Sequence, residues 1–87
     1  MNRSEILKIA NELTSQDREE THGTVADNFE NIANLWSAYL QCSLTKKDVA
    51  LMMALLKIAR TKTGTVNLDD FIDGAAYVAI GGELDEP

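Results

Sequence analysis

Apolar side chains recur at spacings of three and four residues along most of the chain, as on a helix with one buried face. The first such stretch begins after Ser4, whose hydroxyl can cap a helix, and predicts a helix over about Ser4–Leu13. A second polar signal predicts a short helical turn over Ser15–His22. We expect that turn to end at Gly23, because glycine readily adopts the positive φ of a helix C-terminus.

Two longer helices are predicted in the middle of the chain. The apolar stripe that follows the glycine predicts a helix over about Val25–Gln41. Thr45 stands three residues before Asp48, which is the pattern of a capping box. The apolar residues that follow this box predict a helix over about Lys46–Lys62.

The last helix is predicted from a cap at Asn67 and two acids in the first turn, which complement the helix dipole. We expect it to run to about Ile80 and to stop at Gly81-Gly82, leaving a frayed acidic tail over 83–87. No stretch alternates apolar and polar residues between turn signals, as a strand would. The sequence therefore predicts a single all-α domain over residues 1–87, a small bundle of about four helices plus the short turn.

The predicted helix over Lys46–Lys62 is apolar around most of its circumference. Large apolar side chains occupy two of its sides, and only one sector consists of residues that are not bulky and apolar. The members of that sector are Ala50, Met53, Ala54, Lys57 and Arg60. Three short partner helices in an 87-residue chain can scarcely surround such a helix, so we expect a homodimer or a higher homo-oligomer with this helix and part of the Val25–Gln41 helix at its centre.

Composition narrows the class of protein. A hydrophobic fraction of 45% with 25% charged residues is typical of a folded soluble chain, and no apolar run is long enough for a membrane helix. A net charge of −6 has the wrong sign for gripping a phosphodiester backbone, so we expect no bulk nucleic-acid binding. Cys42 is the only cysteine and the N-terminus lacks the apolar core of a secretory peptide, so we expect a cytoplasmic protein.

Two groups of cations could bind an anionic ligand. Arg18 lies one helical turn before His22, and together with backbone amides near Gly23 they could hold a phosphate or a carboxylate. The alternative is that His22 only caps the turn. Lys57 and Arg60 lie three residues apart beside small alanines, which leaves room for a ligand. The alternative is that they only complement the helix dipole.

Asp69 and Asp73 lie one turn apart on the last helix, with Tyr77 on the same line. Two carboxylates at this spacing could hold Mg²⁺ or could anchor a cation from a neighbouring helix. Asp69 is also explained as a helix cap, whereas Asp73 lies too far into the helix for that role. We therefore expect Asp73 to form a semi-buried ion pair with Arg18, Lys57 or Arg60.

Other residue types add little chemistry. Trp36, Tyr39, Met52 and Met53 could form a stacking platform, but their helical spacing favours core positions. No serine is accompanied by a recognisable base, and the chain has no glycine-rich phosphate loop. The residues therefore give no support for nucleophilic catalysis.

An ordered set of short motifs extends from about Arg18 to Glu83. It consists of Arg18, Thr21-His22-Gly23, Asn28-Phe29, Ile32-Ala33, Leu35 to Leu40, Asp48-Val49-Ala50, Leu55 to Arg60, and the line of Asp69, Asp73 and Tyr77. In this set the chain resembles a family of short phage and prophage proteins carried as a domain of unknown function. That family is in turn faintly similar to phage domains associated with nucleotide modification and to MazG-like all-α nucleotide pyrophosphatases, which are helical oligomers that use clustered carboxylates and Mg²⁺.

Those pyrophosphatases set one pair of acids against another, whereas here Asp48 stands alone and only Asp69 and Asp73 form a pair. The resemblance implies nucleotide handling without a complete two-cluster Mg²⁺ site. Asp69 and Asp73 would hold a metal or orient the cations.

We expect a phage or prophage accessory protein that oligomerises and binds a nucleotide or a similar anionic metabolite. The predicted ligand-binding residues are Arg18, His22, Asn28, Lys57, Arg60 and Tyr77. One alternative is an acidic interaction module that inhibits or modulates a host factor. A third interpretation is a reduced MazG-like nucleotide pyrophosphatase that depends on Mg²⁺.

Overall fold

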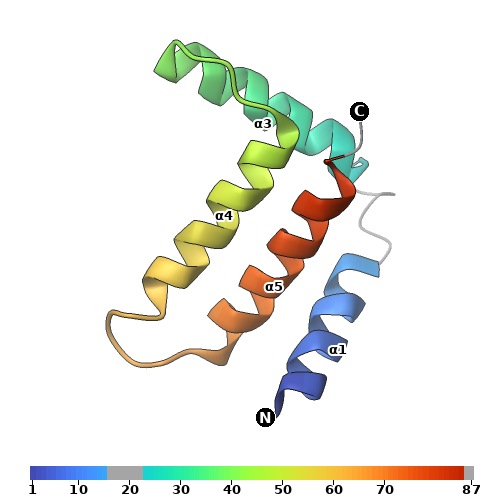
Figure 1. The fold of residues 1–87 in the computed structure, drawn as a ribbon, viewed down its shortest axis with the longest axis vertical. Helices are drawn as coiled ribbons and strands as arrows, with labels where there is room; N and C mark the ends of the chain where they lie inside the picture. Colours follow the sequence, from blue (N-terminus) through green and yellow to red (C-terminus); the bar gives the residue numbers. More distant parts are fainter. Residues whose placement is uncertain (16–22, 86–87) are drawn as a thin grey trace.

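The computed structural model describes residues 1–15 and 23–85 and shows helices without strands over that part of the chain (Figure 1). The helices are α1 (Arg3–Ser15), α3 (Val25–Leu40), α4 (Lys46–Arg60) and α5 (Leu68–Glu83). The predicted all-α class is confirmed. The turn predicted over Ser15–His22 lies outside the described residues apart from Ser15, which ends α1. Gly23 has a φ of 80°, as its expected role requires.

Three of the helices lie side by side. α4 and α5 form an antiparallel pair, and α1 packs along the other side of α5 (Figure 1). α3 crosses the end of this row where α4 begins and α5 ends, and it packs against α4. None of the described helices is both long and apolar enough to cross a membrane.

Short polar side chains determine where most of these helices begin. The side chains of Thr24, Thr45 and Asn67 accept hydrogen bonds from first-turn amides of α3, α4 and α5. α1 differs from the prediction, because its cap is Asn2 rather than Ser4. The amide of Glu5 donates to Asn2 Oδ1 at 2.9 Å, and the amide of Asn2 donates to Glu5 Oε1 at 3.3 Å. This reciprocal pair starts the helix earlier than expected.

The prediction that Gly81-Gly82 stops the last helix is wrong, because α5 continues to Glu83. Gly81 is buried against α4, and a Cβ placed on it would lie 3.1 Å from Leu51 Cδ2. Glycine at this position therefore permits close packing of the two helices instead of ending one of them. The acidic tail is partly tied down as well, since Asp85 pairs with Lys47 at 2.7 Å.

The core is made largely of small side chains. The buried hydrophobic residues of the described segments are Ala10, Ala33, Val49, Ala50, Ala54, Ile72 and Ala76, of which only a valine and an isoleucine are larger than alanine. Ala10 of α1 and Ile72 and Ala76 of α5 form one cluster. Many of the large apolar side chains lie on the surface instead, which leaves a small core for a chain of this hydrophobic content.

Candidate functional site

The sector of α4 that was expected to face open space faces α5. Ala50 and Ala54 are buried, and a Cβ placed on Gly74 of α5 would lie 3.6 Å from Lys57 Cβ. Small residues on both helices let the two backbones approach closely. The premise that Lys57 and Arg60 flank an uncrowded ligand-binding face is therefore wrong, since α5 occupies that face.

Lys57 is held in this seam by Asp73. The distance from Lys57 Nζ to Asp73 Oδ2 is 3.1 Å, with the two side chains 17% and 34% exposed. The predicted semi-buried ion pair of Asp73 across two helices is confirmed. Because this lysine already has a carboxylate partner, an incoming anion would compete with Asp73 for it.

A second ion pair crosses the same seam, between Arg60 of α4 and Asp70 of α5. The Arg60 Nε lies 3.9 Å from Asp70 Oδ1, and the Asp70 side chain is only 10% exposed. The cap of α5 uses a hydrogen bond from the Asp69 amide to Asn67 instead, at 2.9 Å. Asp70 is one of the two first-turn acids that were expected only to complement the helix dipole, so its burial in the seam is a feature that sequence reasoning missed.

The sequence does contain a signal for this second pair. Lys57 and Arg60 are three residues apart on α4, and Asp70 and Asp73 are three residues apart on α5. When two helices run antiparallel, such spacings align in reverse order, so one cation meets each acid. The signal becomes readable only once α4 and α5 are known to be adjacent.

The predicted metal ligands are not brought into a cluster. Asp73 takes part in the ion pair with Lys57, and Asp69 is exposed in the first turn of α5. Across residues 1–15 and 23–85, no three His, Cys, Asp or Glu side chains lie close enough together to hold a metal ion. The Mg²⁺ site at Asp69 and Asp73 stays a prediction.

Four predicted ligand-binding residues remain, and the structure describes two of them. Arg18 and His22 lie outside the described residues. The amide of Asn28 bonds to Thr24 O at 3.0 Å, at the start of α3. The Tyr77 ring packs on Phe29 with a centroid distance of 6.3 Å, so it joins α5 to α3.

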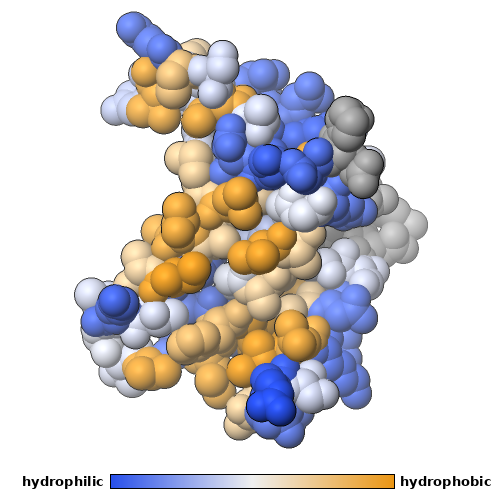
Figure 2. Space-filling view, viewed as in Figure 1, coloured by the Kyte–Doolittle hydropathy of each residue, from blue (hydrophilic) through white to orange (hydrophobic). Residues whose placement is uncertain are grey.

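An apolar surface extends over α1, α4 and α5, where the space-filling view shows hydrophobic side chains gathered (Figure 2). We define it by six large side chains that are each more than a third exposed. They are Leu7, Leu51, Leu55, Ile58, Phe71 and Val78. Among the residues expected in the core, Tyr39 is 87% exposed and Met52 is 37% exposed, so that expectation is wrong for both.

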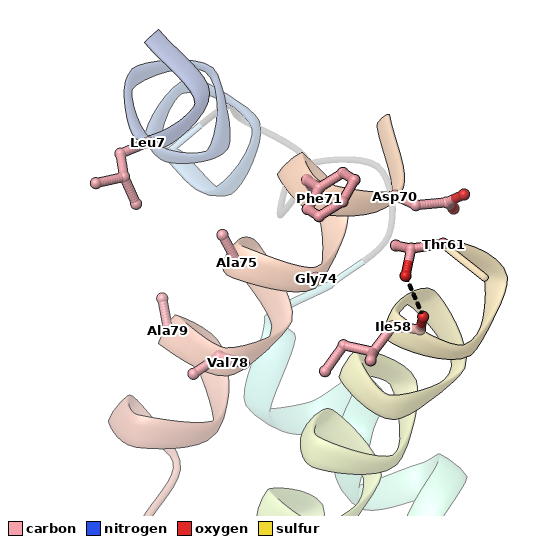
Figure 3. A pocket seen from close by; sticks show the side chains of 9 residues that line it. All are labelled: Leu7, Ile58, Thr61, Asp70, Phe71, Gly74, Ala75, Val78 and Ala79. Carbon is pink, nitrogen blue, oxygen red and sulfur yellow. Dashed lines mark hydrogen bonds between the residues drawn. The ribbon is translucent and has the colours of Figure 1, made fainter. Parts of the chain in front are cut away.

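Part of this apolar surface is hollowed into a pocket of about 480 Å³ (Figure 3). Leu7 of α1, Ile58 of α4 and Val78 of α5 line it. Asp70 and Thr61 lie at one end, where the Thr61 hydroxyl donates to Ile58 O at 2.6 Å. The walls are otherwise aliphatic or aromatic, so the pocket is suited to an apolar group.

The fold and surface define a class: a small all-α protein with paired charges in its helix seam and a broad apolar face. Within that class, the chain belongs to the family described as "Domain of unknown function (DUF6378)", whose model matches residues 5–85. No solved structure matches it significantly.

Two similar proteins come from mycobacterial phages. The chain is 37% identical over 83 residues to "Gene 55 protein" of Mycobacterium phage L5, covering 94% of this chain and 53% of that protein. It is 40% identical over 72 residues to "Gene 55 protein" of Mycobacterium phage D29, covering 83% and 48%. The chain thus spans about half the length of these relatives. The predicted resemblance to phage proteins of unknown function is confirmed, while the similarity to MazG-like enzymes stays a prediction.

Proposed function

We propose that this chain is an association module of a phage accessory protein, which acts by binding another protein through its apolar surface. The observation that supports this proposal most strongly is that small side chains form the core while large apolar side chains lie on the surface. Alanines form most of the core, whereas Leu55, Ile58 and Phe71 are 63%, 52% and 47% exposed. Large apolar side chains gathered on an exposed surface are typical of surfaces that contact a partner.

The energetic incentive for association is substantial. Fully burying one leucine, isoleucine or phenylalanine side chain stabilises a structure by about 1.5–3 kcal/mol. Covering even half of the exposed part of the six side chains is therefore worth several kcal/mol. The pocket between Leu7, Ile58 and Val78 adds a concave element that a protruding apolar side chain could fill.

Binding of a nucleotide has less support from the geometry. Lys57 pairs with Asp73 and Arg60 lies near Asp70, so a phosphate would have to displace carboxylates that are already in place. The notion of a reduced pyrophosphatase meets the same difficulty, because it would take Asp73 from its lysine. Modulation of a host factor is compatible with the proposal, since such a factor is one class of protein that the apolar surface could bind.

The proposal is tested by photo-crosslinking in cells that make the protein. A photoreactive phenylalanine analogue replaces Leu55 in one variant and Glu12, an exposed residue of α1, in the matched control. Irradiation should give a discrete adduct with a protein for position 55 and not for position 12. If neither position gives a discrete adduct, or both give the same one, the apolar surface is not an interface.

A further inference from the structure

We propose that the partner on the apolar surface is a second copy of this chain, joined by a two-fold axis at which the two α4 helices pack antiparallel around Leu55. This inference rests on the proposed function and goes beyond it by naming the partner and the geometry of contact. The observations concern the size of the core, the surface area of the chain, and the residues that line the outer side of α4.

The small size of the core indicates a partner that is always bound. Val49 is the largest of the described side chains that are fully buried, and five of the seven buried hydrophobic residues are alanines. A protein that meets its partner only occasionally needs a core that keeps it folded alone. Obligate homodimers have no such requirement, because each copy completes the other's core.

The chain exposes more surface than a compact monomer of its mass. The chain exposes 6404 Å². A compact monomer of 9.6 kDa exposes about 5,100 Å². The excess of roughly 1,300 Å² is more than the ~800 Å² that each partner contributes to a standard interface. The radius of gyration of 13.7 Å likewise exceeds the ~12 Å expected for a compact chain of this length.

The outer side of α4 carries a continuous apolar row. Leu51, Leu55 and Ile58 follow one another at spacings of four and three residues, which places them on one side of the helix. Leu55 is the most exposed of the large apolar residues of α4 and lies roughly 100° to 140° around the helix from the buried Ala54 and Ala50. A helix that packs on α5 through one side and on a second α4 through this neighbouring row has Leu51, Leu55 and Ile58 covered as well.

Charge at the two ends of this row fixes the direction of packing. Asp48 precedes the row and Lys62 follows it, each seven residues from Leu55. The hydrogen bond from the Thr45 amide lowers the pKa of Asp48, which therefore carries its charge. Antiparallel helices centred on Leu55 bring each Asp48 near the other copy's Lys62. Parallel helices would instead bring like charges together, which is unfavourable.

The geometry is tested by a disulfide at the two-fold axis. Cys42→Ser removes the only native thiol, and Leu55→Cys is then added. Packed helices lie 8–10 Å apart, which leaves facing Cα atoms about 3.5–5.5 Å apart, a range that overlaps the distances a disulfide spans. Mild oxidation should convert this variant to a covalent dimer, while Glu12→Cys in the same background should form no covalent dimer. Equal conversion of the two variants would overturn the antiparallel seam.

A charge reversal tests the same contact without touching the core. Lys62→Glu should weaken the dimer roughly tenfold, because two attractive contacts become repulsive. Lys8→Glu makes the same change of charge on α1 and should have no comparable effect. Equal weakening by both substitutions would overturn the contact between Asp48 and Lys62.

Failure of the inference is distinguishable from failure of the proposed function. A monomeric purified protein that still gives a discrete adduct with a different protein at position 55 overturns self-association and leaves the association module intact. A monomer that gives no adduct overturns both.

Discussion

The ion pair between Lys57 and Asp73 offers the most quantitative test of the helix seam. Asp73→Ala leaves the Lys57 ammonium, whose side chain is 17% exposed, without its carboxylate partner. Exposed ion pairs contribute about 0.2–1 kcal/mol, and breaking a fully buried pair costs about 3–5 kcal/mol. With one side chain mostly buried and the other one-third exposed, the expected loss in the free energy of unfolding is about 1–2 kcal/mol.

Denaturant unfolding at one fixed protein concentration measures this loss, since association would otherwise shift the result. A double-mutant cycle with Lys57→Ala isolates the pairwise energy, expected at about 1 kcal/mol. The matched control is the cycle on Lys47 and Asp85, which are closer at 2.7 Å but 40% and 63% exposed. Exposure rather than distance should govern the energy, so the control should show the smaller coupling. Equal coupling in the two cycles, or none for Lys57 and Asp73, would refute the reasoning.

Three further predictions follow from the helix contacts and the predicted ligand. Gly82→Ala should stabilise α5 by roughly 0.5–1 kcal/mol, because nothing lies within 4 Å of the added methyl group. Gly81→Val should destabilise the protein, because the larger side chain would clash with Leu51. Equal thermal shifts for the two variants would contradict this. Hydrogen bonding lowers the folded pKa of Asp48, so its contribution to stability is present above the unfolded pKa and is lost as the pH falls through the folded pKa. Asp48→Asn should flatten that acid limb, and an unchanged pH profile would argue against it. Nucleotide binding through Lys57 and Arg60 requires that a nucleotide panel, with and without Mg²⁺, raise the melting temperature of the wild type and not that of Lys57→Ala, Arg60→Ala; no shift with any nucleotide would remove that function.

The helices themselves could be predicted from the sequence because local rules govern them. Thr45 and Asp48 form the expected capping box, and Asn67 caps α5 as expected. The departures occur where tertiary packing overrides local preference. Gly81 reads as a helix stop in isolation, but the close approach of Leu51 gives it a packing role. Asn2 competes with Ser4 for the start of α1, and the reciprocal bond with Glu5 favours Asn2.

The candidate site was harder to predict, because the orientation of α4 depends on its neighbours. A sector of small residues can be an open face or a close helix contact, and the pattern of Ala50 and Ala54 is the same in both cases. Two glycines of α5 decide between them, since a Cβ on Gly81 would lie 3.6 Å from Ala50 Cβ and a Cβ on Gly74 would lie 3.6 Å from Lys57 Cβ. Lys57, the partner of Asp73, is one of the three cations that the sequence predicts for it. Asp73 lies too far into α5 to cap the helix, so an ion pair is its expected role. The burial of Asp70 depends on the same contact and could not be seen from its position in a first turn.

In the proposed dimer, another copy of the chain covers the large apolar side chains of α1, α4 and α5. Size-exclusion chromatography with multi-angle light scattering on the wild-type protein at micromolar concentration tests it most directly. The expected mass is twice the chain mass of 9.6 kDa, and dilution should lower thermal stability as the dimer dissociates. A particle of 9.6 kDa that unfolds cooperatively at a temperature independent of concentration would contradict the account.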